Sequence, residues 1–327
     1  MTEKMLNWGF LSTAKINQRV IPVFRESKRN RLHAIASRKQ ETADAYARQW
    51  RFPLAFGTYE AMLASPDVDV VYNPLPNHLH AEWTIKALRA GKHVLCEKPF
   101  ALTVEEVDSV QRTAEETGKI VAEAFMYRHH AQTLKVREMV DDGVLGKIRL
   151  IRGSFTYQFT REDNYRAVPD MGGGALWDIG CYPLSYARAM LGLEPVEVFG
   201  WQVKGVSGID DSFIAQMRFQ GDVYAQFDCS FVVPYHTFME VVGDEATLII
   251  PMPFTPMSKE FLFLTREKKT EKITVKSTGL YNGEVEDMAD AILLGKPPRI
   301  SLADTRNNVK TILALYESAK LGRPINL

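Results

Sequence analysis

The segment from Leu6 to Asn17, which reads Leu-Asn-Trp-Gly-Phe-Leu-Ser-Thr-Ala-Lys-Ile-Asn, carries the fold prediction. A short apolar run ends in small residues, a pattern typical of a strand that turns directly into a helix. In a dinucleotide-binding fold, such a turn lets backbone amides and a helix N-terminus approach a pyrophosphate. Ser12, Ala14 and Asn17 replace the three glycines of the usual fingerprint, so this stretch alone is a weak signal. An ordinary turn between strand and helix remains the alternative.

The alternation of short apolar runs and amphipathic stretches continues to about residue 124. Further strands are predicted at Leu32–Ala36, Val68–Asn73, His93–Cys96 and Ile120–Ala122, with helical stretches such as Thr42–Trp50 and Leu79–Ala90 between them. Repeated strand–helix units with right-handed crossovers build a parallel sheet covered on both faces. The sequence therefore predicts an α/β fold, with a doubly wound Rossmann domain over residues 1–126.

The pattern changes after Met126. Strand-like segments follow one another from Ile148–Phe159 to Lys272–Val275 with few helices between them, and the chain returns to helical spacing at Val285–Leu293 and Ala303–Leu321. This order predicts an α+β domain over residues 127–327 with a large open, mostly antiparallel sheet. We expect the last helix to pack back on the first domain.

Composition excludes several classes of protein. The 327 residues carry no formal net charge, and no basic stripe suggests a nucleic-acid partner. No apolar run approaches the roughly 18 residues that a membrane span needs, so we expect a cytoplasmic protein that binds no membrane. Cys96, Cys181 and Cys229 are widely spaced, which favours reduced core thiols over disulfides or a metal knuckle.

The end of the second predicted strand indicates the cofactor. An acidic residue there would bind the ribose of NAD(H), but this chain has Ser37, Arg38 and Lys39. A hydroxyl and two cations suit a 2'-phosphate, and an arginine can bind it in a bidentate way. A solvated basic turn is the alternative, and we favour NADP(H) over NAD(H).

Two further motifs carry candidate chemistry. Glu97, Lys98 and Pro99 follow the fourth strand, at the sheet edge where open parallel sheets bind ligands. Downstream, the stretch from Gly172 to Tyr182 reads GGGALWDIGCY, with Asp178 four residues before Tyr182 and hence on the same face of a helix.

Together these motifs resemble the Gfo/Idh/MocA, or glucose-fructose oxidoreductase, family over nearly the whole chain. They occur in order: the turn at 8–17, NPLPNHLH at 73–80, EKP at 97–99, AFMYRHH at 124–130 and GGGALWDIGCY at 172–182. The resemblance implies a Rossmann domain, an α+β domain with an open sheet, and a catalytic lysine at Lys98. Many members have histidine where this chain has Tyr182. In having tyrosine at this position, the chain resembles the branch of the family that contains xylose dehydrogenases, anhydrofructose reductases and dihydrodiol dehydrogenases.

The side chains suggest a mechanism. A free tyrosine titrates near ~10, so Tyr182 needs a nearby cation such as Lys98 to act as a base at neutral pH. In the reductive direction Tyr182 would protonate the carbonyl oxygen that Lys98 polarises. Asp178 could orient the lysine, the tyrosine or a sugar hydroxyl, and the sequence leaves these open. The structural alternatives are a surface lysine, a core aromatic residue and an aspartate at a helix start.

The remaining site predictions concern the cofactor and the substrate. By resemblance, the loop at residues 73–80 lies along the ribose and phosphates of the cofactor. The residues predicted to contact the cofactor are Ser12, Thr13, Ala14, Lys15, Ile16, Ser37, Arg38, Asn73, Pro74, Leu75, Asn77, His80, Glu97, Lys98 and Trp177. The predicted substrate contacts are Arg128, Arg166 and Tyr281. We expect no metal site, because His78 and His80 have no third ligand nearby in sequence.

The favoured function is hydride transfer between NADP(H) and a pyranose sugar, a keto- or anhydro-sugar, or a related cyclic diol. One alternative, from the same resemblance, is a glycoside-cleaving enzyme that recycles its nicotinamide. Another is a non-catalytic NAD(P)-binding regulator of the same fold. A small polyhydroxylated molecule is the expected partner, and a homodimer is the expected assembly.

Overall fold

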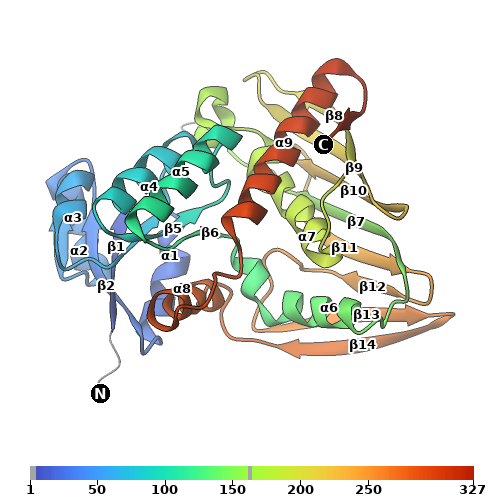
Figure 1. Cartoon of the computed structure of the whole chain (residues 1–327), viewed down its shortest axis with the longest axis horizontal. Helices are drawn as coiled ribbons and strands as arrows, with labels where there is room; N and C mark the ends of the chain where they lie inside the picture. Colours follow the sequence, from blue (N-terminus) through green and yellow to red (C-terminus); the bar gives the residue numbers. More distant parts are fainter. Residues whose placement is uncertain (1–4, 161–163) are drawn as a thin grey trace. The chain divides into compact units, whose positions relative to one another are not determined.

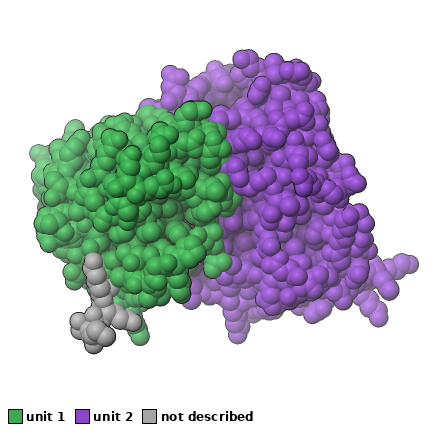
Figure 2. All heavy atoms as spheres, viewed as in Figure 1, with its two compact units in different colours: residues 1–126, 281–306 green, residues 127–280, 307–327 purple. Residues whose placement is uncertain are grey.

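The computed structural model describes residues 5–160 and 164–327, and its course is drawn in Figure 1. The chain divides into two compact units, coloured separately in Figure 2. Unit 1 comprises Met1–Met126 and Tyr281–Arg306, and unit 2 comprises Tyr127–Leu280 and Asn307–Leu327. The sequence prediction divides the chain once, after residue 126, whereas in the structure the chain returns to unit 1 at Tyr281.

Unit 1 contains a six-stranded parallel sheet in the order β3-β2-β1-β4-β5-β6. The strands are β1 (Leu6–Leu11), β2 (Asn30–Ala36), β3 (Leu54–Phe56), β4 (Val70–Asn73), β5 (His93–Glu97) and β6 (Val121–Ala124). The apolar side chains of β1, β4, β5 and β6 are almost fully buried, as expected for a sheet with helices on its faces. This confirms the predicted doubly wound fold. The short edge strand β3 was not predicted, because three half-buried residues give no readable period.

Strand register brings the carboxyl ends of four neighbouring strands to one edge. Leu11 of β1 pairs with Ala36 of β2, and Phe10 of β1 pairs with Tyr72 of β4. Asn73 of β4 pairs in turn with Cys96 of β5. The turn after β1, the end of β2, the loop after β4 and Glu97–Lys98 therefore share one edge of the sheet in unit 1.

Helices cover this sheet, and α4 and α5 lie side by side (Figure 1). The helix α5 begins with a capping box between Thr103 and Glu106. The helices of this unit are α1 (Asn17–Val20), α2 (Gln40–Trp50), α3 (Tyr59–Ala64), α4 (His80–Arg89), α5 (Val104–Thr117), α8 (Asn282–Leu294) and the start of α9 (Leu302–Leu321).

The start of α9 is tied to the rest of unit 1 by two contacts. Thr305 donates a hydrogen bond of 2.9 Å to buried Glu123, and Arg306 pairs with Asp108 at 2.6 Å. These contacts explain why a segment distant in sequence belongs to the first unit.

Unit 2 is built on a nine-stranded sheet in the order β14-β13-β12-β11-β7-β10-β9-β8-β15. Only the pair β7–β10 is parallel, so the predicted mostly antiparallel sheet is confirmed. Its strands are β7 (Ile148–Thr156), β8 (Glu197–Lys204), β9 (Asp210–Phe219), β10 (Val223–Ser230), β11 (His236–Gly243), β12 (Thr247–Ile250), β13 (Lys259–Arg266), β14 (Lys269–Lys276) and β15 (Ile325–Asn326).

Alternate side chains of β9 and β10 are buried, because one face of the sheet carries helices. The helix α7 (Cys181–Leu191) packs on β7 and β10, and α6 (Ala131–Asp141) lies near β14. All three cysteines are buried thiols that form no disulfide, as predicted. Among the described residues, no helix is both long and apolar enough to cross a membrane.

Candidate active site

Lys98 directly follows β5 at the carboxyl edge of the sheet in unit 1, and its peptide bond to Pro99 is cis. The preceding residue, Glu97, accepts a hydrogen bond of 2.5 Å from the hydroxyl of Tyr72 on β4. Tyr72 is fully buried, and burial beside Glu97 raises its pKa well above the ordinary value. The phenol therefore stays protonated and holds the backbone before Lys98 through a donated hydrogen bond.

A second acid lies close to Glu97. Glu284 on α8 is 1% exposed, and neither of its carboxyl oxygens has a hydrogen-bond partner. Burial first, and the charge of Glu97 second, raise the pKa of Glu284 well above its ordinary value. Tyr281 has its pKa raised by the same two acids after burial. Burial and the neighbouring acid both favour the protonated form of Glu284.

His80 links two loops of this edge. One ring nitrogen lies 2.8 Å from the carbonyl oxygen of Pro99, and the other lies 2.6 Å from that of Leu75. Burial lowers the pKa of His80 to about 4, so the ring is neutral and only one nitrogen donates. The ring of His80 therefore lies between the Asn73–Asn77 loop and Pro99, the residue after Lys98, and donates a hydrogen bond to one of them. Asn73 closes the same loop by donating to the His80 carbonyl at 3.1 Å and accepting at 3.4 Å from the amide of Leu75.

The turn after β1 has a defined backbone shape. Ser12 has φ 67°, a left-handed conformation that non-glycine residues seldom adopt, and Asn17 donates 2.9 Å to its carbonyl. The amide of Ser12 donates to Ala36, which places this turn beside Ser37. Arg38 and Lys39 follow on the surface with exposed side chains, as a site for a phosphate requires. Residues 13–16 of the turn lie between Ser12 and Asn17, which the hydrogen bond from Asn17 holds together.

Asp178 is the centre of a polar cluster in unit 2. It lies in a π-helical turn, Leu176–Gly180, that runs directly into α7. Its Oδ2 accepts hydrogen bonds of 2.8 Å from the Tyr157 hydroxyl and from Nε of Arg166. The Asp178 side chain is 6% exposed and that of Arg166 31%. The charge of Asp178 raises the pKa of Arg166 further above its ordinary value, so the guanidinium remains charged.

Tyr182 lies near the start of α7 among aromatic side chains. Its ring centroid is 5.4 Å from Phe155, 5.5 Å from Phe254 and 5.6 Å from Tyr127. The residue is 5% exposed. Four residues later, the buried hydroxyl of Tyr186 has no hydrogen-bond partner. Both tyrosines therefore lie on α7, and Tyr186 is a matched control position for substitutions of Tyr182.

The structure places the other predicted residues as follows. Arg128 donates 3.1 Å to Ser185 on α7, so it belongs to unit 2 with Arg166. Tyr281 belongs to unit 1, with Glu97. The indole of Trp177 lies 6.0 Å from the ring of Tyr316 on α9, away from the partners of its neighbour Asp178. Within residues 5–160 and 164–327, no group of three or more His, Cys, Asp or Glu side chains could hold a metal.

Sequence reasoning missed Tyr72, Tyr157 and Glu284. Each stands outside a motif, in a strand or helix whose pattern indicates only burial. In sequence, Glu284 resembles the acidic residues that are common in the first turn of a helix. Only the structure shows that its carboxyl oxygens have no hydrogen-bond partner.

Sequence profiles identify both parts of the chain. Residues 6–125 match the oxidoreductase family with an NAD-binding Rossmann fold, and residues 133–249 match the GFO/IDH/MocA C-terminal domain. The chain belongs to the Gfo/Idh/MocA oxidoreductase family. As a member of this family, it is an NAD(P)-dependent oxidoreductase.

Relatives match this Gfo/Idh/MocA protein over its whole length. D-xylose 1-dehydrogenase (NADP(+)) 2 from Haloferax volcanii is 34% identical, covering 98% of this chain and 99% of its own. The 3-ketoreductase KijD10 from Actinomadura kijaniata, solved with NADP and TDP-benzene, has a TM-score of 0.90 at 31% identity and covers 96% and 98% of the two chains. Aldose-aldose oxidoreductase from Caulobacter crescentus, solved with glycerol, has a TM-score of 0.93 at 26% identity and covers 99% and 100%.

Proposed function

We propose that this Gfo/Idh/MocA protein transfers hydride between NADP(H) and a pyranose sugar, a keto- or anhydro-sugar, or a related cyclic diol. The observation that carries the proposal is the shared sheet edge of unit 1. There the turn at Ser12, the Ser37–Arg38 pair and Lys98 follow neighbouring strands. Such an edge is where open parallel sheets bind nucleotides, with the reactive ring near the last of these strands.

The bound nicotinamide would supply or accept the hydride. Lys98 would polarise the substrate carbonyl oxygen, and Tyr182 would donate a proton to that oxygen during reduction and accept it during oxidation. The Tyr72–Glu97 hydrogen bond and His80 would hold the loop of Lys98 in place. These roles follow from the chemistry of an ammonium group and a phenol acting on the same oxygen.

The contacts of Asp178 favour a role that differs from the three considered from the sequence. Its side chain is engaged by Arg166 and Tyr157, so we propose that Asp178 orients this arginine toward substrate hydroxyls. A guanidinium whose charge is balanced in this way presents its remaining N–H groups in a fixed direction. Arg128 would contribute from the same unit.

The relatives support the substrate class and the cofactor. They include an NADP(+)-dependent xylose dehydrogenase, a 3-ketoreductase solved with NADP, and an aldose-aldose oxidoreductase. Structures of KijD10 include one variant with a lysine replaced and another with a tyrosine replaced. That lysine and that tyrosine are separated by the same number of residues as Lys98 and Tyr182. This spacing supports a joint role for the two side chains.

A substrate screen tests the proposal. Monosaccharides, anhydro-sugars and trans-diols are incubated with NADP+ or NADPH, and absorbance of the reduced nicotinamide is followed. We expect turnover with at least one sugar. We also expect the protein to prefer NADP(H) clearly over NAD(H). Arg38→Ala should raise KM for NADPH about tenfold or more and leave KM for NADH nearly unchanged, because it removes only the contact to the 2'-phosphate. Equal effects on both cofactors would contradict the assignment of Arg38.

Redox stoichiometry separates this function from one that recycles the cofactor. Net production or consumption of NADPH during turnover supports the dehydrogenase or reductase. Transformation of a sugar without net change in NADPH would instead support recycling, which the similarity to an aldose-aldose oxidoreductase makes worth measuring.

We also propose a homodimer through the open face of the sheet in unit 2. Trp201 of β8, Ile214 of β9 and Tyr224 of β10 are 50%, 41% and 48% exposed on neighbouring strands. Large apolar side chains gathered in this way favour burial against a partner. Light scattering after size exclusion measures the assembly, and Trp201→Glu should shift it to monomer.

A further inference from the structure

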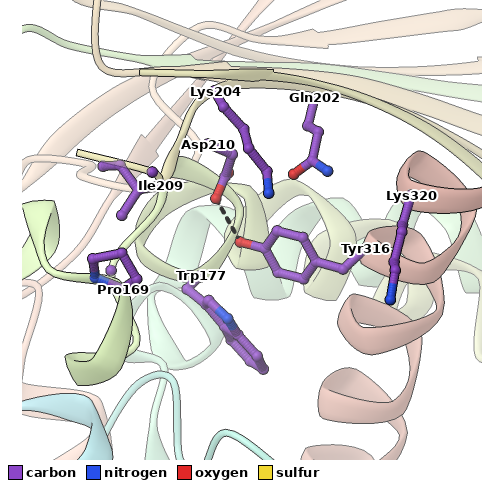
Figure 3. Close-up of a pocket in the computed structure, with 10 residues that line it drawn as sticks. Pro169, Trp177, Gln202, Lys204, Ile209, Asp210, Tyr316 and Lys320 are labelled. Atoms are coloured by element: carbon purple, nitrogen blue, oxygen red, sulfur yellow. Dashed lines mark hydrogen bonds between the residues drawn. The ribbon is translucent and has the colours of Figure 1, made fainter. Parts of the chain in front are cut away.

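A cavity in unit 2 lies beside the segment that carries Asp178. Its volume is about 390 Å³, which is large enough for one monosaccharide with a substituent. It is bounded by β8, the start of β9, the π-helical turn and α9, and Figure 3 shows the side chains around it. The residues that matter for the argument are Pro169, Trp177, Gln202, Lys204, Tyr316 and Lys320.

Aromatic rings form one wall of this cavity. Trp177 and Tyr316 lie 6.0 Å apart with their planes inclined by 39°, and Pro169 lies nearby in the lining. Indole and phenol faces of this kind pack against the apolar C–H face of a sugar ring. The amide of Gln202 lines the same space and offers both a donor and an acceptor to hydroxyl groups (Figure 3).

A buried carboxyl group lies at the base. Asp210 accepts hydrogen bonds of 2.7 Å from the Tyr316 hydroxyl and from the amide of Leu176. Burial raises the pKa of Asp210 to about 7, so the acid carries at most part of a negative charge at neutral pH. The base of the cavity therefore repels an anion less than an ionised aspartate would.

Two cations complete the lining. Lys204 extends from β8 and Lys320 from α9, and both side chains are exposed. Across residues 5–160 and 164–327, neither lysine forms an ion pair with an acidic side chain. Two uncompensated ammonium groups beside a partly protonated acid favour a ligand with a concentrated negative charge.

We propose that this cavity binds a phosphorylated monosaccharide, with the sugar ring against Trp177 and Tyr316 and the phosphate on Lys204 and Lys320. The site goes beyond the proposed redox activity because, of the residues that line it, only Trp177, a predicted cofactor contact, also belongs to the proposed active site. The aromatic faces would pack against the sugar ring. Gln202 and Asp210 would hydrogen-bond its hydroxyl groups, and the two lysines would bind the phosphate.

The cavity and the Asp178 cluster share one short segment. The amide of Gly174 donates 3.0 Å to the carbonyl of Arg166, and the amide of Asp178 donates 3.0 Å to the carbonyl of Gly174. A Cβ on Gly174 would lie 2.1 Å from Asp210, so the segment passes directly over the base of the cavity. A ligand in the cavity therefore contacts the segment that holds Arg166 beside Asp178.

Calorimetry tests the proposal on the full chain saturated with NADP+, so that the phosphate contact at Arg38 is already occupied. Glucose 6-phosphate, glucose and inorganic phosphate are titrated separately. We expect glucose 6-phosphate to bind with a dissociation constant below about 1 mM, and each part alone at least about tenfold more weakly. No binding of the phosphosugar, or equal binding of inorganic phosphate, would overturn the proposal.

Matched variants locate the bound ligand. Lys204→Met and Lys320→Met should each weaken binding of glucose 6-phosphate about tenfold, since each removes one charge-assisted contact. Lys310→Met, an equally exposed position on α9 that lies outside this cavity, should leave the affinity unchanged. Thermal unfolding checks that each variant is folded. Binding that survives both of the first two substitutions would contradict the assignment.

Tyr182→Phe separates this site from the proposed active site. The variant should lose turnover yet bind glucose 6-phosphate with wild-type affinity. Loss of binding in this variant would assign the ligand to the Asp178–Tyr182 region and overturn a second site. Binding without any NADPH-linked turnover in the wild-type protein would instead contradict the proposed function alone.

Discussion

Asp178 in unit 2 and Glu284 in unit 1 are both buried carboxyl groups, but they differ in how the cost of burying a negative charge is met. Asp178 receives hydrogen bonds from Arg166 and Tyr157, so its negative charge is compensated. Glu284 has no hydrogen-bond partner and lies near a second acid, and its pKa is raised, which favours the neutral form. Burial alone does not decide the charge of a side chain, because a partner can outweigh the cost of desolvation.

This difference separates the two parts of the candidate site. In unit 2 a compensated aspartate fixes a charged arginine, which suits recognition of hydroxyl groups. In unit 1 burial favours the protonated form of an acid that lies near Glu97, the residue before Lys98. We expect Lys98 of unit 1 and Tyr182 of unit 2 to contribute differently to the reaction rate. Substitution of each residue measures its contribution.

The largest effect is expected at the lysine of unit 1. Lys98→Ala should lower kcat/KM about a thousandfold, because it removes the cation that polarises the substrate oxygen. The rate of NADPH oxidation with the sugar found in the screen measures it. Lys86→Ala, an exposed lysine paired with Glu82 on α4, is the control and should retain full activity. A loss below about threefold in Lys98→Ala would remove the lysine from the mechanism.

The tyrosine of unit 2 should follow. Tyr182→Phe is expected to lower kcat about a hundredfold with little change in stability, since only a proton donor is lost. Tyr186→Phe removes a buried hydroxyl without a partner from the same helix and should leave kcat unchanged. If the two variants had similar kcat values, Tyr182 would be a packing residue.

Removing the partner of Asp178 tests the compensated carboxylate. Arg166→Met should reduce the free energy of unfolding by about 2 kcal/mol, because it leaves a buried charge with one partner fewer; partial exposure of Arg166 keeps the loss below that of a fully buried pair. It should also raise KM for the sugar more than it changes kcat. Denaturant titration and steady-state kinetics measure the two effects, and an unchanged KM would contradict the substrate role.

The smallest effect is expected at the neutral carboxyl of unit 1. Because the pKa of Glu284 in the folded protein lies above its ordinary value of 4.5, the folded state holds this proton more tightly than the unfolded state. The resulting stabilisation is complete below pH 4.5 and is lost as the pH rises toward the raised pKa. Glu284→Gln, which cannot titrate, should change stability by about 1 kcal/mol or less at pH 5.

The difference between Glu284→Gln and wild type should then shift in favour of the variant as the pH rises. Thermal unfolding between pH 5 and 9 measures it. A difference that stays constant over this range would mean that Glu284 does not hold its proton in the folded state.

The sequence by itself determined the doubly wound sheet, the mostly antiparallel second sheet and the family. Strand and helix periods are local, and they are clear wherever one face of an element is buried, as in the alternating strand at 210–219. The motifs around Lys98 and Tyr182 are likewise contiguous in the chain, so they were recognisable without coordinates. The roles of these two residues remain predictions.

Only the tertiary structure decided which side chains meet. The return of Tyr281–Arg306 to unit 1 brings Glu284 near Glu97, and the pairing of Asp178 with Arg166 and Tyr157 joins residues from three separate segments. The cavity between β8, the π-helical turn and α9 depends on packing in the same way. No local period encodes such contacts, because they arise from sheet order and chain return, and these depend on the whole fold at once.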